Sequence, residues 1–128
     1  LLAKLSIFDD ELILRSKVAS KYLMLLSGVN VKSVPIVSPF SLGVWAQFTI
    51  AVANRDKIQL GLSEKGIPTA IHYPTPLNKQ PAVMDQNAFM PISEEASKYV
   101  ISLPMGPYLD EDAQRTVIRE LKDIVGSF

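Results

Sequence analysis

The chain of 128 residues contains no cysteine and a single histidine, His72. Disulfides, thiolate chemistry and cysteine-based zinc sites are therefore excluded, and one imidazole cannot build a histidine-rich metal site. No apolar run approaches the roughly 20 residues that a bilayer-spanning helix needs. From these observations we expect no metal centre and no membrane-spanning helix. The absence of cysteine fits a cytoplasmic protein.

An excess of charge of one sign is also missing, because 13 Lys and Arg residues balance 13 Asp and Glu residues. A neutral total gives no electrostatic reason to expect nucleic acid or an anionic membrane as a partner. Apolar residues make up 48% of the chain and charged residues 20%. This balance and length suit one globular domain with a single core.

The first residues lack an initiator methionine, and they also lack the basic start of a signal peptide. Leu1–Leu5 already has the pattern of a helix interior, and no Ser, Thr, Asp or Asn precedes it as a cap. The simplest interpretation is that the chain is a fragment of a larger protein.

Residues 1–26 are expected to form one long helix, because apolar residues recur at steps of three and four from Leu5 to Leu26. Arg15 interrupts the stripe, and Gly28 is placed to end the helix. Such a helix would be roughly 39 Å long, about the diameter of the whole domain. It either packs partly on something outside this chain, with an exposed apolar stripe over roughly Leu1 to Leu12, or lies across its own domain.

The remaining pattern predicts an α+β layer, with a small, mostly antiparallel sheet and helices on one face. Strands are expected at 45–52, 67–73 and 100–103 from their alternation and flanking turns. Helices are expected at 55–65, from Ser93 onward and from Asp110 onward. Their predicted N-caps are Asn54, Ser93 and Asp110. The last helix carries a core stripe of Val117, Leu121, Ile124 and Val125.

The segment 74–90 is the main candidate for function, because long irregular segments are uncommon and often functional. Alternation directs Ile67 to the core and His72 to the opposite side of the strand that precedes the segment. Tyr73 and three polar residues follow: Asn78, Lys79 and Gln80. These side chains can donate to phosphate or sugar oxygens, and the prolines limit the entropy lost on binding. From the residues alone, a proline-rich solvated connector is the commoner interpretation.

Several runs together resemble the C-terminal region of the DegT/DnrJ/EryC1/StrS sugar aminotransferases. The opening Leu2–Leu5 with Phe8 and Asp9 is similar to the helix that joins the large and small domains of those enzymes. Similarity is strongest to members that aminate UDP-linked 3-keto N-acetylhexosamine or uronate sugars in lipopolysaccharide O-antigen synthesis. The resemblance covers essentially the whole chain, and the runs that carry it are Trp45–Ile50, Asn54–Asp56, Gly66–Pro74, Pro76–Leu77, Gln80–Ala82 and Ser102–Met105 with Pro107 and Leu109.

This resemblance implies the small C-terminal domain of a fold type I enzyme dependent on pyridoxal phosphate (PLP). Residues 1–28 would be the linking helix and residues 29–128 the small domain. It further implies a homodimer with active sites at the subunit interface, glutamate as amino donor and a nucleotide sugar as acceptor. The PLP-bearing lysine would lie in a large domain absent from this chain, which alone would hold no cofactor and no catalytic residue.

The resemblance also implies a substrate-binding set of His72, Tyr73, Asn78 and Gln80. Related sequences usually carry His at the position of Asn78, and Asn can hydrogen-bond but cannot be a cation. Lys79 is not expected to be the Schiff-base lysine, because that role requires burial or a cationic neighbour. Among prolines and polar residues, Lys79 should stay charged and solvated.

Two alternative functions stay open on the sequence. The chain could be a stand-alone α+β module that binds a small ligand, without catalysis. It could also be the small domain of another fold type I PLP enzyme with different chemistry. The length of the complete gene would distinguish a stand-alone module from a sugar aminotransferase. The identity of the substrate would distinguish another fold type I enzyme from a sugar aminotransferase.

Overall fold

A computed structural model describes residues 2–127, and a two-stranded antiparallel sheet lies at its centre. Strand β1 (Phe48–Ala51) pairs with β2 (Val100–Leu103), so that Phe48 lies opposite Leu103 and Ala51 opposite Val100. The sheet is therefore small and antiparallel, as the sequence predicts.

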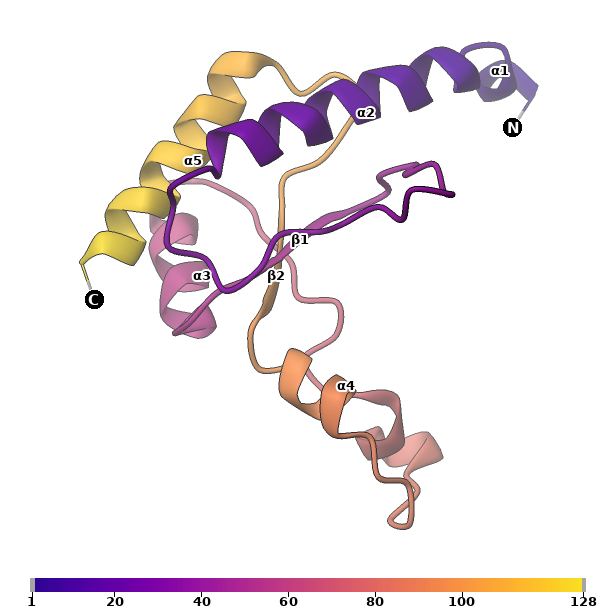
Figure 1. Ribbon diagram of the computed structural model, residues 1–128, viewed down its shortest axis with the longest axis vertical. Coiled ribbons are helices and arrows are strands. Elements are labelled where there is room, and N and C mark those ends of the chain that lie inside the picture. Colours follow the sequence, from indigo (N-terminus) through magenta and orange to yellow (C-terminus); the bar gives the residue numbers. More distant parts are fainter. Residues whose placement is uncertain (1, 128) are drawn as a thin grey trace.

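Three helices gather on one side of this sheet (Figure 1). They are α2 (Phe8–Leu25), α3 (Arg55–Glu64) and α5 (Glu111–Gly126). On the other side the chain extends into a projection that contains the short helix α4 (Pro91–Ala96). We call residues 74–99 the arm. The α+β fold with helices on one face is confirmed.

The core lies between the sheet and the three helices. Alternation along β1 buries Phe48, Ile50 and Val52 on the helix-covered side, and Phe48 is 0% exposed. The Phe48 ring lies 5.0 Å from the ring of Tyr22, between ring centres, so α2 belongs to the same core as the sheet. Buried Gln114 of α5 adds a polar link, since its Nε2 donates to the Val18 carbonyl at 2.8 Å.

The close packing of α3 against α5 explains a glycine within α3. A Cβ added at Gly61 would lie 3.0 Å from Ile124 Cδ1, tighter than ordinary contact. The cost of glycine to helix stability is thus offset by a close approach of the two helices. On α5, Val117 and Leu121 are buried and Ile124 and Val125 are half-buried, so the predicted stripe faces the core.

The prediction of one unbroken helix over 1–26 is wrong. The structure has α1 (Leu2–Leu5), a turn at 6–7, and then α2. The Ser6 hydroxyl donates back to the Ala3 carbonyl, a local bond that competes with the helical ladder. No residue of α1 is buried, so packing does not hold the two pieces straight.

The predicted apolar stripe at this end of the chain is exposed, as expected. Leu2 is 83%, Leu5 58% and Phe8 51% exposed, and Leu12 is half-buried. Leu1 lies outside the described residues. No helix within 2–127 combines the length and the apolar character that crossing a bilayer requires.

The predicted strand at 67–73 is also wrong. Only Ala70 pairs with the sheet, as an isolated bridge to Ser102. Pro68 has no N–H to donate to a ladder, and the chain bends away from the sheet at His72. The predicted burial pattern nevertheless holds, because Ile67 is buried and His72 is exposed.

One of the three predicted helix caps is correct. The Asp110 carboxylate accepts from the Ala113 N–H at 2.7 Å and begins α5. Asn54 occupies the cap position of α3, but its side chain makes no capping hydrogen bond. Its backbone is in the left-handed region, with φ at +52°. Ser93 lies inside α4, which begins two residues earlier at Pro91, because proline suits the first helical turn.

Candidate functional site

His72 and Tyr73 lie where the chain leaves the sheet, next to a pair of hydroxyls. His72 Nδ1 is 3.4 Å from Ser102 Oγ, which in turn is 2.8 Å from Thr49 Oγ1. Thr49 and Ser102 are directly paired across β1 and β2. The sheet therefore orients the His72 imidazole through Ser102, a contact that the sequence pattern does not predict.

The Tyr73 ring packs edge-on against the His72 ring, with 5.7 Å between centres. Tyr73 is 71% exposed, and His72 is exposed as well. The two rings thus form a preorganised aromatic corner open to solvent. Such a corner can contact a ring or a sugar face and can donate from the phenol and the imidazole.

Asn78 and Gln80 use their amide nitrogens within the arm. Asn78 Nδ2 donates to the Ala88 carbonyl at 3.3 Å and to Glu94 Oε1 at 3.0 Å. Gln80 Nε2 donates to the Thr75 carbonyl at 2.9 Å. Both N–H groups of Asn78 are therefore engaged in the protein, which leaves its amide oxygen for a ligand, whereas Gln80 uses one of its two N–H groups.

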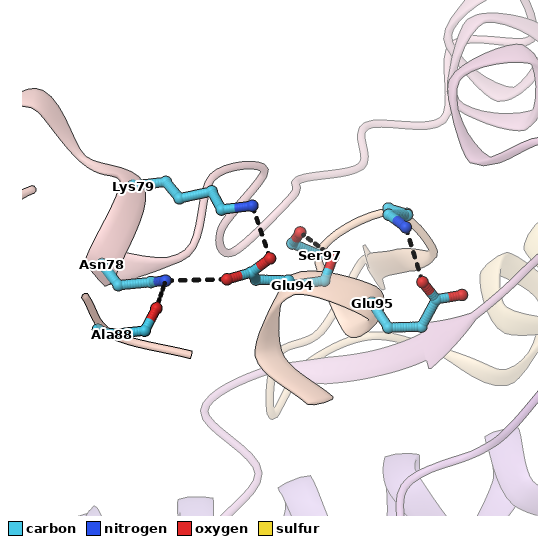
Figure 2. Close-up of polar contacts among 7 residues, drawn as sticks. Asn78, Lys79, Ala88, Glu94, Glu95 and Ser97 are labelled. Carbon is cyan, nitrogen blue, oxygen red and sulfur yellow. Dashed lines mark hydrogen bonds and ion pairs between the residues drawn. The ribbon is translucent and has the colours of Figure 1, made fainter. Parts of the chain in front are cut away.

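Glu94 belongs to this region although the sequence pattern does not single it out. Its Oε2 accepts from Lys79 Nζ at 2.6 Å while its Oε1 accepts from Asn78 (Figure 2). Donation by Lys79, and then by Asn78, lowers the pKa of the Glu94 carboxyl below its ordinary value. Glu94 follows Asn78 by 16 residues, a spacing that no helical or strand period connects, so no local signal could have paired them.

The candidate residues therefore form two groups. His72 and Tyr73 stand at the edge of the sheet, whereas Asn78 and Lys79 are tied to α4 by Glu94. The short 3₁₀ turn η1 (Leu77–Lys79) carries the second group. The bond from Gln80 to Thr75 connects the two groups along the chain.

The lysines of residues 2–127 do not fit the covalent anchor of PLP. None of them is buried, and Lys79 Nζ lies 2.6 Å from Glu94 Oε2 in an ion pair. Within the same residues, no three His, Cys, Asp or Glu side chains gather as a metal site would require.

The family model of the DegT/DnrJ/EryC1/StrS aminotransferase family matches residues 1–122, and the chain belongs to this family. A relative from Pseudomonas aeruginosa, UDP-2-acetamido-2-deoxy-3-oxo-D-glucuronate aminotransferase, is 47% identical over 110 residues. These residues are 86% of this chain and 30% of that protein. The chain spans about a third of the length of the relatives that it matches.

Solved structures show the same fold. A DegT DnrJ EryC1 StrS aminotransferase from Brucella abortus superposes with a TM-score of 0.89 at 36% identity, covering 98% of this chain and 34% of that one. The protein Spr1654 from Streptococcus pneumoniae, in its PMP form, superposes with a TM-score of 0.87 at 19% identity, covering 98% of this chain and 33% of that one. This second likeness concerns the fold alone.

Proposed function

We propose that this chain is the C-terminal part of a homodimeric, cytoplasmic aminotransferase that moves an amino group from glutamate to a nucleotide-linked keto sugar. Membership of the family supports the reaction class. The substrate named for the P. aeruginosa relative supports a UDP-linked 3-oxo sugar. A role in O-antigen synthesis is part of the proposal and rests on the sequence resemblance. The observation that carries the proposal is the exposed His72–Tyr73 corner beside Ser102.

The complete enzyme would use PLP, which serves as an electron sink when an amino group is transferred. Because the lysines described above do not fit its anchor, PLP would be held by residues outside this chain. The role of this chain in the complete enzyme would be to bind and orient the sugar nucleotide.

His72 would bind the nucleotide sugar rather than transfer protons. With Nδ1 near Ser102 Oγ, the imidazole presents Nε2 to a phosphate or sugar oxygen. The Tyr73 ring would cover one side of the ligand, and its exposed phenol can donate a hydrogen bond.

Asn78 would contact the substrate through its amide oxygen, because both N–H groups of its Nδ2 are engaged in the arm. Gln80 would use its amide oxygen in the same way and has a second N–H beside the one bonded to Thr75. An amide oxygen accepts from a hydroxyl and repels an anionic oxygen. These two residues therefore suit sugar hydroxyls, and the uncharged Asn78 would not hold the diphosphate.

The decisive experiment compares the two half-reactions in the complete enzyme after His72→Ala. Loss of one hydrogen bond to a charged group should weaken nucleotide-sugar binding roughly 10- to 150-fold. The glutamate half-reaction and the melting temperature should stay close to wild type. Equal loss in both half-reactions, or a loosened fold, would show that His72 is only structural.

A second exposed tyrosine, Tyr108, provides a matched control for Tyr73. Tyr73 is 71% and Tyr108 is 70% exposed, but Tyr108 donates to Glu11 Oε1 on α2. Tyr73→Ala should weaken the sugar half-reaction, and Tyr108→Ala should not. If both variants behave alike, the aromatic corner is not the substrate site.

The chain by itself is expected to have no transaminase activity. Mixed with PLP, glutamate and a keto sugar nucleotide, it should form no amino sugar beyond the background of free PLP. Turnover above that background would contradict the proposal and favour a self-sufficient module.

A further inference from the structure

The arm is anchored at one carboxylate. Glu94 accepts from two different side chains, with Lys79 Nζ on one oxygen and Asn78 Nδ2 on the other (Figure 2). Both donors come from the 3₁₀ turn η1, whereas Glu94 comes from α4. A single side chain thus fixes the turn against the helix at two points.

Asn78 extends this anchor into the rest of the arm. Its amide also donates to the Ala88 carbonyl, and its own backbone carbonyl accepts from the Asp85 N–H at 3.1 Å. The loop 85–88, the turn η1 and α4 therefore meet around the Asn78 side chain. Removal of Glu94 would release α4 and would also loosen Asn78, which orients the loop 85–88.

The anchor also connects to the candidate substrate corner. Gln80 directly follows η1 and donates to the Thr75 carbonyl, two residues beyond Tyr73. Pro74 and Pro76 restrict the backbone of this stretch. A displacement of η1 is therefore passed to Tyr73 over a short and stiff connection.

Burial does not provide an alternative way of holding the arm. Between 74 and 99 the one buried residue is the polar Ser97. The ion pair itself is partly exposed, with 54% of the Lys79 and 25% of the Glu94 side chain accessible, and such pairs contribute little alone. The arm is instead ordered because one carboxylate accepts from two donors and so holds η1 against α4 in one position.

We propose that Glu94 is a positioning residue, which holds Asn78 and Lys79 together and thereby sets the place of the His72–Tyr73 corner for nucleotide-sugar binding. This role rests on the proposed function. It differs from catalysis, because Glu94 acts through its neighbours and is not required to touch the substrate.

The chain contains a matched control for this role. Glu95 is adjacent on α4, is also a carboxylate, and pairs with Lys98 at 2.7 Å within the same helix and its following turn. Its ion pair does not cross to η1. Glu94→Ala and Glu95→Ala therefore remove the same chemical group and one ion pair each, but only the first opens the anchor.

The first measurement uses the chain by itself and does not depend on the proposed function. In Glu94→Ala, the Asp85 amide should exchange with solvent about tenfold faster, and the Asn78 side-chain amide should shift. The Ile50 amide of the core should be unchanged. Glu95→Ala should leave all three as in wild type. An unchanged Asp85 amide in Glu94→Ala overturns the proposal.

The second measurement follows the sugar half-reaction in the complete enzyme. Glu94→Ala should raise KM for the nucleotide sugar about tenfold while the glutamate half-reaction is unchanged. Glu94→Gln retains an oxygen for Asn78 but has no charge for Lys79, so it should fall between wild type and Glu94→Ala. Glu95→Ala should match wild type.

The outcomes separate this role from the function on which it rests. Equal loss in both half-reactions, or the same effect from Glu95→Ala, overturns positioning by Glu94 while the sugar aminotransferase stands. A wild-type complete enzyme that does not aminate nucleotide sugars overturns the proposed function and this role with it.

Discussion

The helix-covered core and the arm are held by different interactions. In the core, apolar side chains such as Phe48, Ile50 and Leu121 are almost completely buried. In the arm, apolar side chains are exposed, with Phe89 at 83% and Ile92 at 84%, and order comes from hydrogen bonds and from the ion pairs Lys79–Glu94 and Lys98–Glu95. Packing is strong and insensitive to pH, whereas the polar links of the arm are weak and can be titrated. The following predictions test this contrast, beginning with the largest effect.

Phe48→Ala should destabilise the chain by about 3 to 5 kcal/mol, because it removes a buried ring between Tyr22 and Trp45 and leaves a cavity. Phe40, which is 98% exposed, provides the control, and Phe40→Ala should change stability by less than about 0.5 kcal/mol. Chemical denaturation measures both. Similar losses in the two variants would contradict the assigned core.

Asp110→Ala should cost about 1 kcal/mol, since it removes the capping bond to the Ala113 N–H at the start of α5. Ser93→Ala in the arm should cost nothing measurable, because Ser93 lies inside α4 and makes no cap. Thermal unfolding of both variants tests the difference. A loss at Ser93 as large as that at Asp110 would mean that α4 begins where the sequence pattern placed it.

Tyr22→Phe should cost about 1 kcal/mol, because the buried phenol donates to the Pro104 carbonyl at 2.9 Å. Burial also raises the pKa of the Tyr22 phenol, so the group stays a neutral donor at physiological pH. Tyr108→Phe removes an exposed hydrogen bond and should have a smaller effect. Chemical denaturation of the two variants tests whether the buried hydrogen bond of Tyr22 contributes more to stability than the exposed one of Tyr108.

Acid should loosen the arm before it affects the core. The pKa of Glu94 is lower in the folded chain than its ordinary value of 4.5, so its contribution is complete above that pH. The contribution is lost as the pH falls through the lower folded value. The Asn78 side-chain amide should therefore shift on acidification while the Ile50 amide does not, as followed by NMR. In Glu94→Gln this transition should be absent, and its persistence would assign it to another group.

Prediction from sequence succeeded where burial and period agree. Strand β2 has the expected bounds at 100–103, and Asp110 caps α5 as expected. The same reasoning failed at Ser93, because Pro91 already begins α4, and at 67–73, because only Ala70 pairs with the sheet there. For residues 1–26, the prediction of an exposed apolar stripe was confirmed, and the prediction of one unbroken helix was wrong.

For the candidate site, the sequence pointed to one segment but not to its internal contacts, and the role of that segment in substrate binding stays a prediction. His72 is exposed at the end of the sheet, in agreement with the alternation along 67–73, whereas Tyr73 is exposed although the alternation places it on the same side as Ile67. The engagement of Asn78 and Gln80 could not be foreseen, because their partners Glu94 and Thr75 follow no periodic spacing. Their substrate contacts stay a prediction.

The amino-acid order alone was sufficient for the α+β class, the core faces of β1 and α5, and the family resemblance, because these depend on local period and on motifs. Only the tertiary structure joins Glu94 to Asn78 and Lys79, and His72 to Ser102. Long-range polar pairs need two side chains at one point in space, and their positions are set by how the chain folds between them.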